Sequence, residues 1–295
     1  MRARNGLCII KPMNTTSRYA ERYDRDGFVS PIDVMDAAEA RTWRSAFEQA
    51  EQIWKSIDDA EERRCIAGFP HFVFPDIGAM VRDSRIIDAV AQVLGHDLLC
   101  WNLSFWVKEP GTGSYVSWHQ DLNYWGLDAE DEATAWIALS PATVQSGCMQ
   151  FARGTHRSRL AHRDTFGDDN MLTRGQEVET EIDPKDAVDV VLQPGQMSLH
   201  HGLLCHASGP NRSDDRRIGL ALRYIKPSMQ QVYGDGDLAV LVRGEDRYGH
   251  FRLVDTAAEL MHPAGVQHCR EVTALHDNIL FRGAEDRIPG KATAP

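Results

Sequence analysis

Two residues that can bind a metal ion lie close together in the segment SYVSWHQDLNYW, residues 114–125. His119 and Asp121 are separated by one residue, and side chains at that spacing on a β-strand point to the same side. An imidazole and a carboxylate could therefore reach one metal ion. His162 and Asp164 have the same spacing, but polar residues surround them. We predict a solvated loop at this second pair and a metal site at the first.

A third protein ligand would have to come from another strand. The segment PGQMSLHHGLLCHASGPN, residues 194–211, contains three histidines. His200 and His206 would face the same side of an unbroken strand, whereas His201 and His206 would face opposite sides. The strand period therefore leaves His200 and His206 as candidates. Two imidazoles and one carboxylate on one face of an iron ion leave three positions open, as in non-haem Fe(II) oxygenases.

A basic residue that could bind an anion follows these histidines. Arg217 opens the segment RIGLALRYI, eleven residues after the last of them. On a strand it would share a face with Gly219 and Ala221, and such small neighbours would leave room beside the guanidinium for an anionic ligand. An arginine can bind a carboxylate through two parallel hydrogen bonds. An ion pair with the nearby Asp214 or Asp215 is the alternative role for this arginine.

Two helices are predicted before these segments. From residue 30 to 59, apolar residues recur at three- and four-residue intervals, and Ser30 followed by Pro31 suits a helix start. A second helix is expected at about 83–94, and it would end at Gly95, a residue that favours a left-handed C-terminal cap.

Short apolar and aromatic segments, separated by turn-forming residues, follow between about residues 98 and 226. This pattern favours an all-β barrel or sandwich over alternating βαβ units. Residues 156–185 are polar and form a long stretch, so we expect a functional insertion over one barrel mouth. The region 227–295 is too polar for a core strand, and we expect it to cover the mouth and help to select the substrate.

The composition disfavours several classes of partner. The chain has 295 residues, with 32 Lys plus Arg against 43 Asp plus Glu and a formal net charge of -11. A negative chain without a basic run is a poor partner for nucleic acid or an anionic membrane. No apolar stretch approaches the roughly 20 residues that span a bilayer. The six cysteines are far apart and form no CxxC pair, which is typical of reduced thiols in a cytoplasmic protein.

We expect one domain at residues 19–295. It would contain a helical part at about 30–95, a barrel at about 98–226 and a C-terminal substrate region or lid at 227–295. The first 18 residues contain four basic residues and no acidic one. They are expected to form a flexible leader, although a transit peptide or a start at Met13 would leave the same composition.

Several segments resemble the phytanoyl-CoA dioxygenase family of Fe(II)- and 2-oxoglutarate-dependent oxygenases. WHQDLNYW (118–125) resembles the HQD segment of that family, and SGCMQFARGTH (146–156) resembles one of its turns. PGQMSLHHGLLCHASGPNRSDDRR (194–217) resembles its distal-histidine segment, and YDRDGFVSP (23–31) resembles its opening. In order and spacing, the similarity covers residues 98–226.

The resemblance implies a fold and a set of roles. The fold would be mainly β with flanking α-helices, around a double-stranded β-helix, which is the jelly roll also found in cupins. By position, the residues that match the family's iron ligands are His119, Asp121 and His206. The residues that match its 2-oxoglutarate site are Arg217, which would hold the distal carboxylate, together with Ser208, Trp136 and Ser104.

The resemblance also bears on two choices that the residues alone leave open. It favours His206 as the third ligand, because the ligand in the family precedes an (A/G)SG turn such as the one that follows this histidine. Related halogenases have a small residue at the position of Asp121. The carboxylate at this position therefore implies hydroxylation or another oxidation.

We accordingly expect a dioxygenase that uses Fe(II), 2-oxoglutarate and O2. It would hydroxylate or otherwise oxidise an unactivated C–H bond of a small-molecule metabolite, with release of succinate and CO2. The alternatives are a cupin-like zinc or manganese isomerase or hydrolase, and a catalytically silent jelly-roll binding protein. Aromatic and basic residues near the site are candidates for the substrate pocket: Tyr115, Tyr124, Trp125, Lys108 and Arg223.

Overall fold

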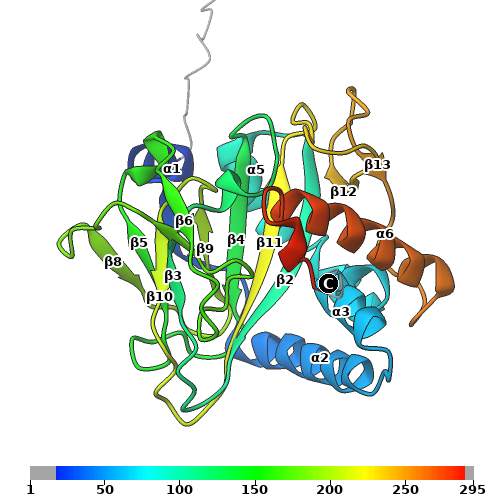
Figure 1. Cartoon of the computed structure of the whole chain (residues 1–295), viewed down its shortest axis with the longest axis horizontal. Helices are drawn as coiled ribbons and strands as arrows, with labels where there is room; N and C mark the ends of the chain where they lie inside the picture. The colour runs from blue at the N-terminus through cyan, green and yellow to red at the C-terminus, as the bar shows by residue number, and fades with distance from the viewer. Residues whose placement is uncertain (1–17, 290–295) are drawn as a thin grey trace, which may run out of the picture.

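The computed structural model describes residues 18–289, and two β-sheets form its centre (Figure 1). The major sheet contains, in spatial order, β1 (Phe28–Asp33), β9 (Gln196–His200), β4 (Glu132–Ala138), β11 (Arg217–Ile225), β2 (Leu98–Lys108), β12 (Leu238–Arg243) and β13 (Arg252–Leu253). The smaller sheet contains β3 (Val116–His119), β10 (His206–Ser208), β5 (Met149–Ala152) and β8 (Ala187–Val190). All strand pairs in both sheets are antiparallel except β12 with β13. The predicted jelly-roll core with flanking helices is confirmed.

Helices cover the side of the major sheet that faces away from the smaller sheet. They are α1 (Arg18–Asp26), α2 (Ala37–Lys55), α3 (Ala60–Gly68), α4 (Pro75–Met80), α5 (Ser84–Leu94) and α6 (Pro263–Leu280). Short 3-10 turns lie at η1 (Pro70–Phe72), η2 (Asp121–Asn123), η3 (Thr155–Arg157) and η4 (Glu285–Arg287). Figure 1 shows α3 and α6 on the far side of β2 from the smaller sheet. No helix within the described range is long and apolar enough to cross a membrane.

The two faces of the major sheet have different compositions because side chains alternate along each strand. On β11, Leu220 and Leu222 belong to the large apolar cluster that includes Phe47 of α2 and Ile86 of α5. The alternate residues, such as Ala221, face the space between the two sheets, where a smaller apolar cluster joins the sheets. The outer face therefore anchors the helices, and the inner face is left for a functional site.

The predicted start of the first helix is wrong. Ser30 and Pro31 belong to β1, which pairs with β9 from Phe28 to Asp33. The register shifts between residues 29 and 32, and a proline, which lacks an N–H group, is tolerated at such an irregular edge position. The helix begins at Ala37 instead, capped by the side chain of Asp36.

The second predicted helix is confirmed. Helix α5 is capped by Asp83, whose carboxylate accepts a hydrogen bond from the N–H of Arg85 at 2.9 Å. Its C-terminal cap is Gly95, where φ is 98° and ψ is -168°, so the glycine has a positive φ but not the predicted left-handed helical conformation. A positive φ of this kind is readily adopted only by glycine.

The predicted solvated loop at the second His–X–Asp pair is also wrong. His162 and Asp164 lie in β6 (His162–Asp164), which pairs with β7 (Gln176–Val178). The Nε2 atom of His162 accepts a hydrogen bond from the backbone N–H of Gln120 at 3.0 Å. Asp164 forms an ion pair with Arg174. The pair therefore fastens this hairpin to the segment that contains the candidate metal site.

The region after residue 227 contributes to the core, contrary to expectation. Strand β12 pairs with β2, and its residues Leu238, Ala239 and Val240 are buried. Helix α6 follows and packs against α3. The apolar run LAVLV is short and has polar residues on both sides, so the sequence did not indicate a core strand there.

The predicted leader at residues 1–18 lies outside the described residues, except for Arg18, the first residue of α1. The division of the remainder into a single domain stays a prediction.

Candidate functional site

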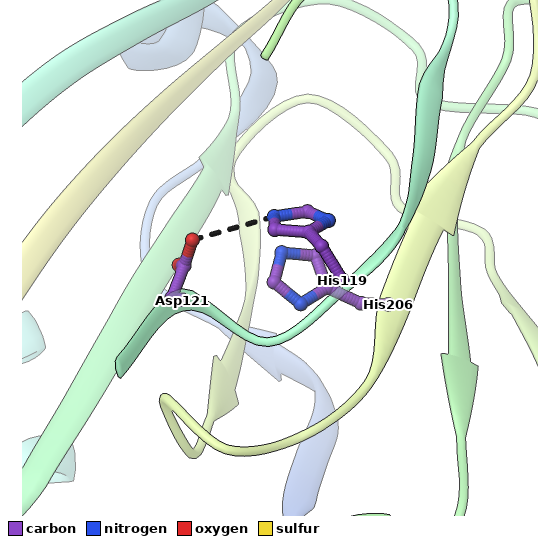
Figure 2. A group of neighbouring side chains, drawn as sticks. All are labelled: His119, Asp121 and His206. Carbon is purple, nitrogen blue, oxygen red and sulfur yellow. Dashed lines mark ion pairs between the residues drawn. The ribbon is translucent and has the colours of Figure 1, made fainter. Parts of the chain in front are cut away.

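The three predicted metal-binding residues come together at one edge of the space between the sheets (Figure 2). His119 is the last residue of β3 and His206 is the first of β10, and the two are direct partners in the antiparallel ladder. Asp121 begins η2, where the chain leaves the strand and turns its carboxylate back toward the imidazoles. One ligand-type atom from each residue lies within 4.8 Å of the others. This arrangement fits a single metal ion.

Backbone hydrogen bonds orient both imidazoles. The Nδ1 atom of His119 lies 2.9 Å from the carbonyl oxygen of Ser117, and that of His206 lies 2.9 Å from the carbonyl oxygen of Leu204. A carbonyl oxygen can only accept, so each Nδ1 carries the proton and donates it. Each Nε2 is then left with its lone pair free, the form in which histidine binds metals.

The electrostatics of the three groups also suit a divalent cation. Burial lowers the pKa of His206 to about 4, with His119 adding to the effect, so this imidazole is neutral at physiological pH. Burial opposes the ionisation of Asp121, but the contact with His119 and the neighbouring charges outweigh it and hold the pKa of Asp121 well below its usual value. The Nε2 atom of His119 lies 3.3 Å from Oδ1 of Asp121. Two imidazoles and one carboxylate form the donor set expected for Fe(II).

A cavity adjoins the three residues, and Arg217 lies in its wall. Only 2% of Arg217 is exposed. Of the two carboxylates considered from the sequence, Asp215 pairs with Arg44 at 2.6 Å, and no ion pair to Arg217 exists between residues 18 and 289. The Nε atom of Arg217 has no hydrogen-bond partner in that range. The ion-pair alternative for this arginine is therefore wrong, and a buried cation faces the cavity without an anion.

Trp136 lies beside Arg217, with its ring centroid 5.4 Å from the guanidinium carbon. The ring occupies the space next to Gly219, because a Cβ atom at that position would lie 1.8 Å from Cζ2 of Trp136. The expectation that Gly219 leaves room for a ligand is thus corrected. The glycine accommodates the tryptophan, and the tryptophan forms a wall of the cavity.

Lys108 is a second buried cation at this end of the cavity. It is the direct strand partner of Arg217 in the pairing of β2 with β11. Its Nζ donates hydrogen bonds to Oγ and the carbonyl oxygen of Ser208, at 2.6 and 3.0 Å, and to the carbonyl oxygen of Gly209. Burial and the charge of Arg217 lower the pKa of Lys108 to about 7. Lys108, which was considered from the sequence for the substrate pocket, therefore lies beside Arg217 and Ser208.

Most of the other predicted residues lie around a second pocket, next to Arg223. Ser104 accepts a hydrogen bond from Nη1 of Arg223 at 2.8 Å. Arg223 lines the cavity of Arg217 and also this second pocket. Tyr124 and Trp125 line that second pocket. Tyr115 is 37% exposed and forms an isolated bridge with Asn170, and it lines neither space.

Sequence reasoning missed several residues of the site. Thr134 and Met149 line the cavity beside His200, which the strand period had already left as a candidate ligand. Thr134 and His200 are direct strand partners on the inner face of the major sheet. The alternation of side chains on β4 was the signal that could have found Thr134. His276, which lines the second pocket, and Asp237, which accepts a hydrogen bond from it, come from the C-terminal region, and no pattern in the sequence indicated them.

Comparison with known proteins identifies the family. A sequence profile described as phytanoyl-CoA dioxygenase matches residues 23–219. The chain belongs to the phytanoyl-CoA dioxygenase family. This confirms the family relationship predicted from the sequence. It also supports the predicted enzyme class, because the curated relatives include a protein named as a probable alpha-ketoglutarate-dependent hypophosphite dioxygenase.

Members and structural neighbours of the phytanoyl-CoA dioxygenase family show how far the similarity extends. A probable alpha-ketoglutarate-dependent hypophosphite dioxygenase from Stutzerimonas stutzeri is 29% identical over 171 residues, which cover 57% of this chain and 59% of that protein. A methylphosphonate hydroxylase from Gimesia maris is 23% identical over 269 residues, which cover 87% of this chain and 96% of that protein. The solved structure of the apo form of ThoJ, a non-heme monooxygenase, is 32% identical, with a TM-score of 0.81 over 91% of this chain and 99% of that one. The chain thus spans about 59% of the length of the first of these relatives.

Proposed function

We propose that the protein is an Fe(II)- and 2-oxoglutarate-dependent oxygenase that hydroxylates or otherwise oxidises a C–H bond of a small molecule. The overall reaction would consume O2 and 2-oxoglutarate and release succinate and CO2. The observation that supports this proposal is the pairing of two features in one cavity. A metal-type trio of His119, Asp121 and His206 adjoins it, and the buried, unpaired guanidinium of Arg217 lines it.

The end of the cavity at Arg217 fits the distal carboxylate of 2-oxoglutarate. Arg217 brings a positive charge there and Lys108 brings a second when it is protonated. Neither forms an ion pair with a carboxylate within residues 18–289. Burying an unpaired charge is costly, so an anionic ligand that pairs with it gains stability. The hydroxyl of Ser208, which is bonded to Lys108, lies at the same end. Trp136 limits the width of the cavity beside the guanidinium.

His119, Asp121 and His206 would hold the iron through the two Nε2 atoms and the carboxylate. When bound, Fe(II) supplies the activation of O2 and the oxidation of a C–H bond, which amino-acid side chains cannot perform. The protein itself positions the reactants and excludes water. The low exposure of the two histidines, 3% and 8%, fits that role. Contacts with charged groups strengthen in such a dry environment.

A zinc or manganese isomerase or hydrolase on the same three ligands is the alternative. It would leave the buried charges of Arg217 and Lys108 without a purpose, because such reactions need no dicarboxylate co-substrate. A small-molecule substrate is supported by relatives that are named for methylphosphonate and hypophosphite. The negative net charge and the buried, unpaired cysteines of the described chain favour a cytoplasmic enzyme without a nucleic-acid or membrane partner.

The proposal is tested by succinate formation from 2-oxoglutarate in the presence of Fe(II) and O2, with a metabolite panel as substrates. We expect Asp121→Ala and His206→Ala to reduce the rate by about a hundred-fold or more, because each removes a metal ligand. His96→Ala and Asp255→Ala are the matched controls. The side chain of His96 is 77% exposed and that of Asp255 94%. If both ligand variants turn over 2-oxoglutarate at the rate of the controls, the proposed function is wrong.

A further inference from the structure

Arg223 forms the boundary between the metal-side cavity and the second pocket. It lies on β11 six residues after Arg217, on the same face of the sheet, so the two Cα atoms are roughly 20 Å apart on an extended strand. Only 7% of Arg223 is exposed. Its Nη1 donates to Oδ1 of Asn102 and Oγ of Ser104, both at 2.8 Å. These two partners are neutral and do not balance its charge.

No carboxylate of the described chain forms an ion pair with Arg223, and its Nε has no hydrogen-bond partner there. The charge of Arg223 interacts with two carboxyl groups, those of Asp121 and Glu132. Asp121 belongs to the metal-type trio. Burial raises the pKa of Glu132 to about 8, so Glu132 is protonated at neutral pH. Apart from Asp121, which is placed to bind the metal, no ionised carboxylate is paired with this cation, so an anionic ligand that pairs with it would be stabilised.

Aromatic rings form the walls of the second pocket next to this cation. The guanidinium carbon of Arg223 lies 5.0 Å from the ring centroid of Trp125. The rings of Trp125 and Trp101 are 5.2 Å apart and tilted by 50°. Tryptophan faces bind flat apolar groups over a large area. The walls therefore favour a planar body over a branched aliphatic one.

A buried carboxylate fixes two of the rings in the pocket. Asp237 accepts hydrogen bonds from Nε1 of Trp101 at 2.7 Å and from Nε2 of His276 at 2.9 Å. His276 comes from helix α6 and lines the pocket. Its Nε2 donates to the carboxylate, which leaves Nδ1 as the second polar atom of the ring. The pocket thus offers a cation at one end, aromatic walls and one additional polar atom.

We propose that this pocket, lined by Arg223, Trp125, Trp101 and His276, binds the primary substrate as an aromatic or otherwise planar carboxylate. The acid group would pair with Arg223 at the boundary with the metal-side cavity, and the planar body would lie against the tryptophans. The reacting C–H bond would then lie within a few bonds of the acid group. This inference rests on the proposed function for the chemistry, but the binding that it requires can be measured without turnover.

The test is equilibrium binding, by calorimetry, to protein loaded with Fe(II) and 2-oxoglutarate under anaerobic conditions. Three probes separate the contributions of charge and shape: 3-phenylpropanoate, its neutral amide, and 3-cyclohexylpropanoate. We expect the aromatic acid to bind about ten-fold or more tightly than the amide, because one charge-assisted pair is lost in the amide. We expect it to bind more tightly than the cyclohexyl acid as well, because that ring cannot lie flat on tryptophan.

Arg223→Gln should abolish the preference for the acid over the amide, and Arg223→Lys should retain part of it. The matched control is Arg247→Gln, since the side chain of Arg247 is 73% exposed. The inference is wrong if neither acid binds, or if Arg223→Gln keeps the preference. It is also wrong if Arg223→Gln weakens 2-oxoglutarate binding by the same factor, since the cation then serves the co-substrate. Failure of the wild type to bind Fe(II) and 2-oxoglutarate would instead contradict the proposed function.

Discussion

Glu132 offers a prediction whose size can be worked out from the structure. Its side chain is fully buried at the start of β4, and Oε1 accepts a hydrogen bond from Oγ1 of Thr134 at 2.7 Å. Burial, with the negative charge of Asp121 adding to it, raises the pKa from 4.5 to about 8. The folded protein therefore keeps a proton on this carboxyl group at neutral pH, whereas the unfolded chain releases it.

The direction of the pH effect follows from this difference. Between pH 4.5 and 8 the folded state binds more protons than the unfolded state at Glu132, so the contribution of this residue to stability falls as pH rises. Each pKa unit corresponds to about 1.4 kcal/mol, so the loss between pH 5.5 and 8.5 is on the order of 3 kcal/mol. Glu132→Gln cannot ionise. The free energy of unfolding of this variant relative to the wild type should therefore rise by about that amount over the same range.

The assay is urea denaturation of the metal-free protein at several pH values from 5.5 to 8.5. The difference between wild type and variant removes the titration of all the other groups. Glu259→Gln, at an exposed position, is the control and should track the wild type throughout. A difference between Glu132→Gln and wild type that stays constant with pH would refute the reasoning, because the buried carboxyl would then be ionised in both states or in neither.

Three further predictions concern the co-substrate end of the cavity. Gly219→Ala would place a methyl group against the ring of Trp136. We expect this variant to lose about 1–3 kcal/mol of unfolding free energy, measured by denaturation, and to bind 2-oxoglutarate more weakly, measured by calorimetry. Arg217→Lys keeps the charge but loses the two-pronged contact, so KM for 2-oxoglutarate should rise by about ten-fold or more while expression and melting temperature stay near wild type. Because the pKa of Lys108 is about 7, the affinity for 2-oxoglutarate should fall as pH rises above 7, by at most about ten-fold per pH unit. Lys108→Met should bind 2-oxoglutarate more weakly, and its affinity should not change with pH in this way. Calorimetry at pH 6.5 and 8.5 measures both effects.

The parts of the site that the sequence predicted best are those fixed by strand geometry. His119 and Asp121 were expected on one face of a strand, and their side chains do converge, although Asp121 lies in the turn after β3. The two side chains still meet because the turn brings the Asp121 carboxylate back toward the strand pair that holds His119 beside His206. Strand period alone could not separate His206 from His200. Both line the cavity, and the difference depends on the pairing of strands far apart in the sequence.

The wrong or missing predictions concern residues whose positions depend on contacts with distant parts of the chain, which the pattern within one segment does not contain. Pairing with β9 turned Ser30 and Pro31 into strand residues, and that partner lies more than 160 residues away in the sequence. Lys108 was a candidate for the substrate pocket as a cation that could meet an anionic substrate. Its true neighbour, Arg217, is set by the register of β2 with β11. His276 reaches the second pocket from a helix whose position depends on tertiary packing.

The central claim is that His119, Asp121 and His206 bind Fe(II) and that 2-oxoglutarate binds beside it at Arg217. Anaerobic titration of the protein with Fe(II), followed by 2-oxoglutarate, tests this most directly through the weak visible charge-transfer band of the chelated complex. The band should appear at one equivalent of each, and it should be absent from His206→Ala and reach saturation only at higher 2-oxoglutarate in Arg217→Lys. A wild-type protein that binds zinc tightly at this site and gives no band with Fe(II) and 2-oxoglutarate would contradict the account.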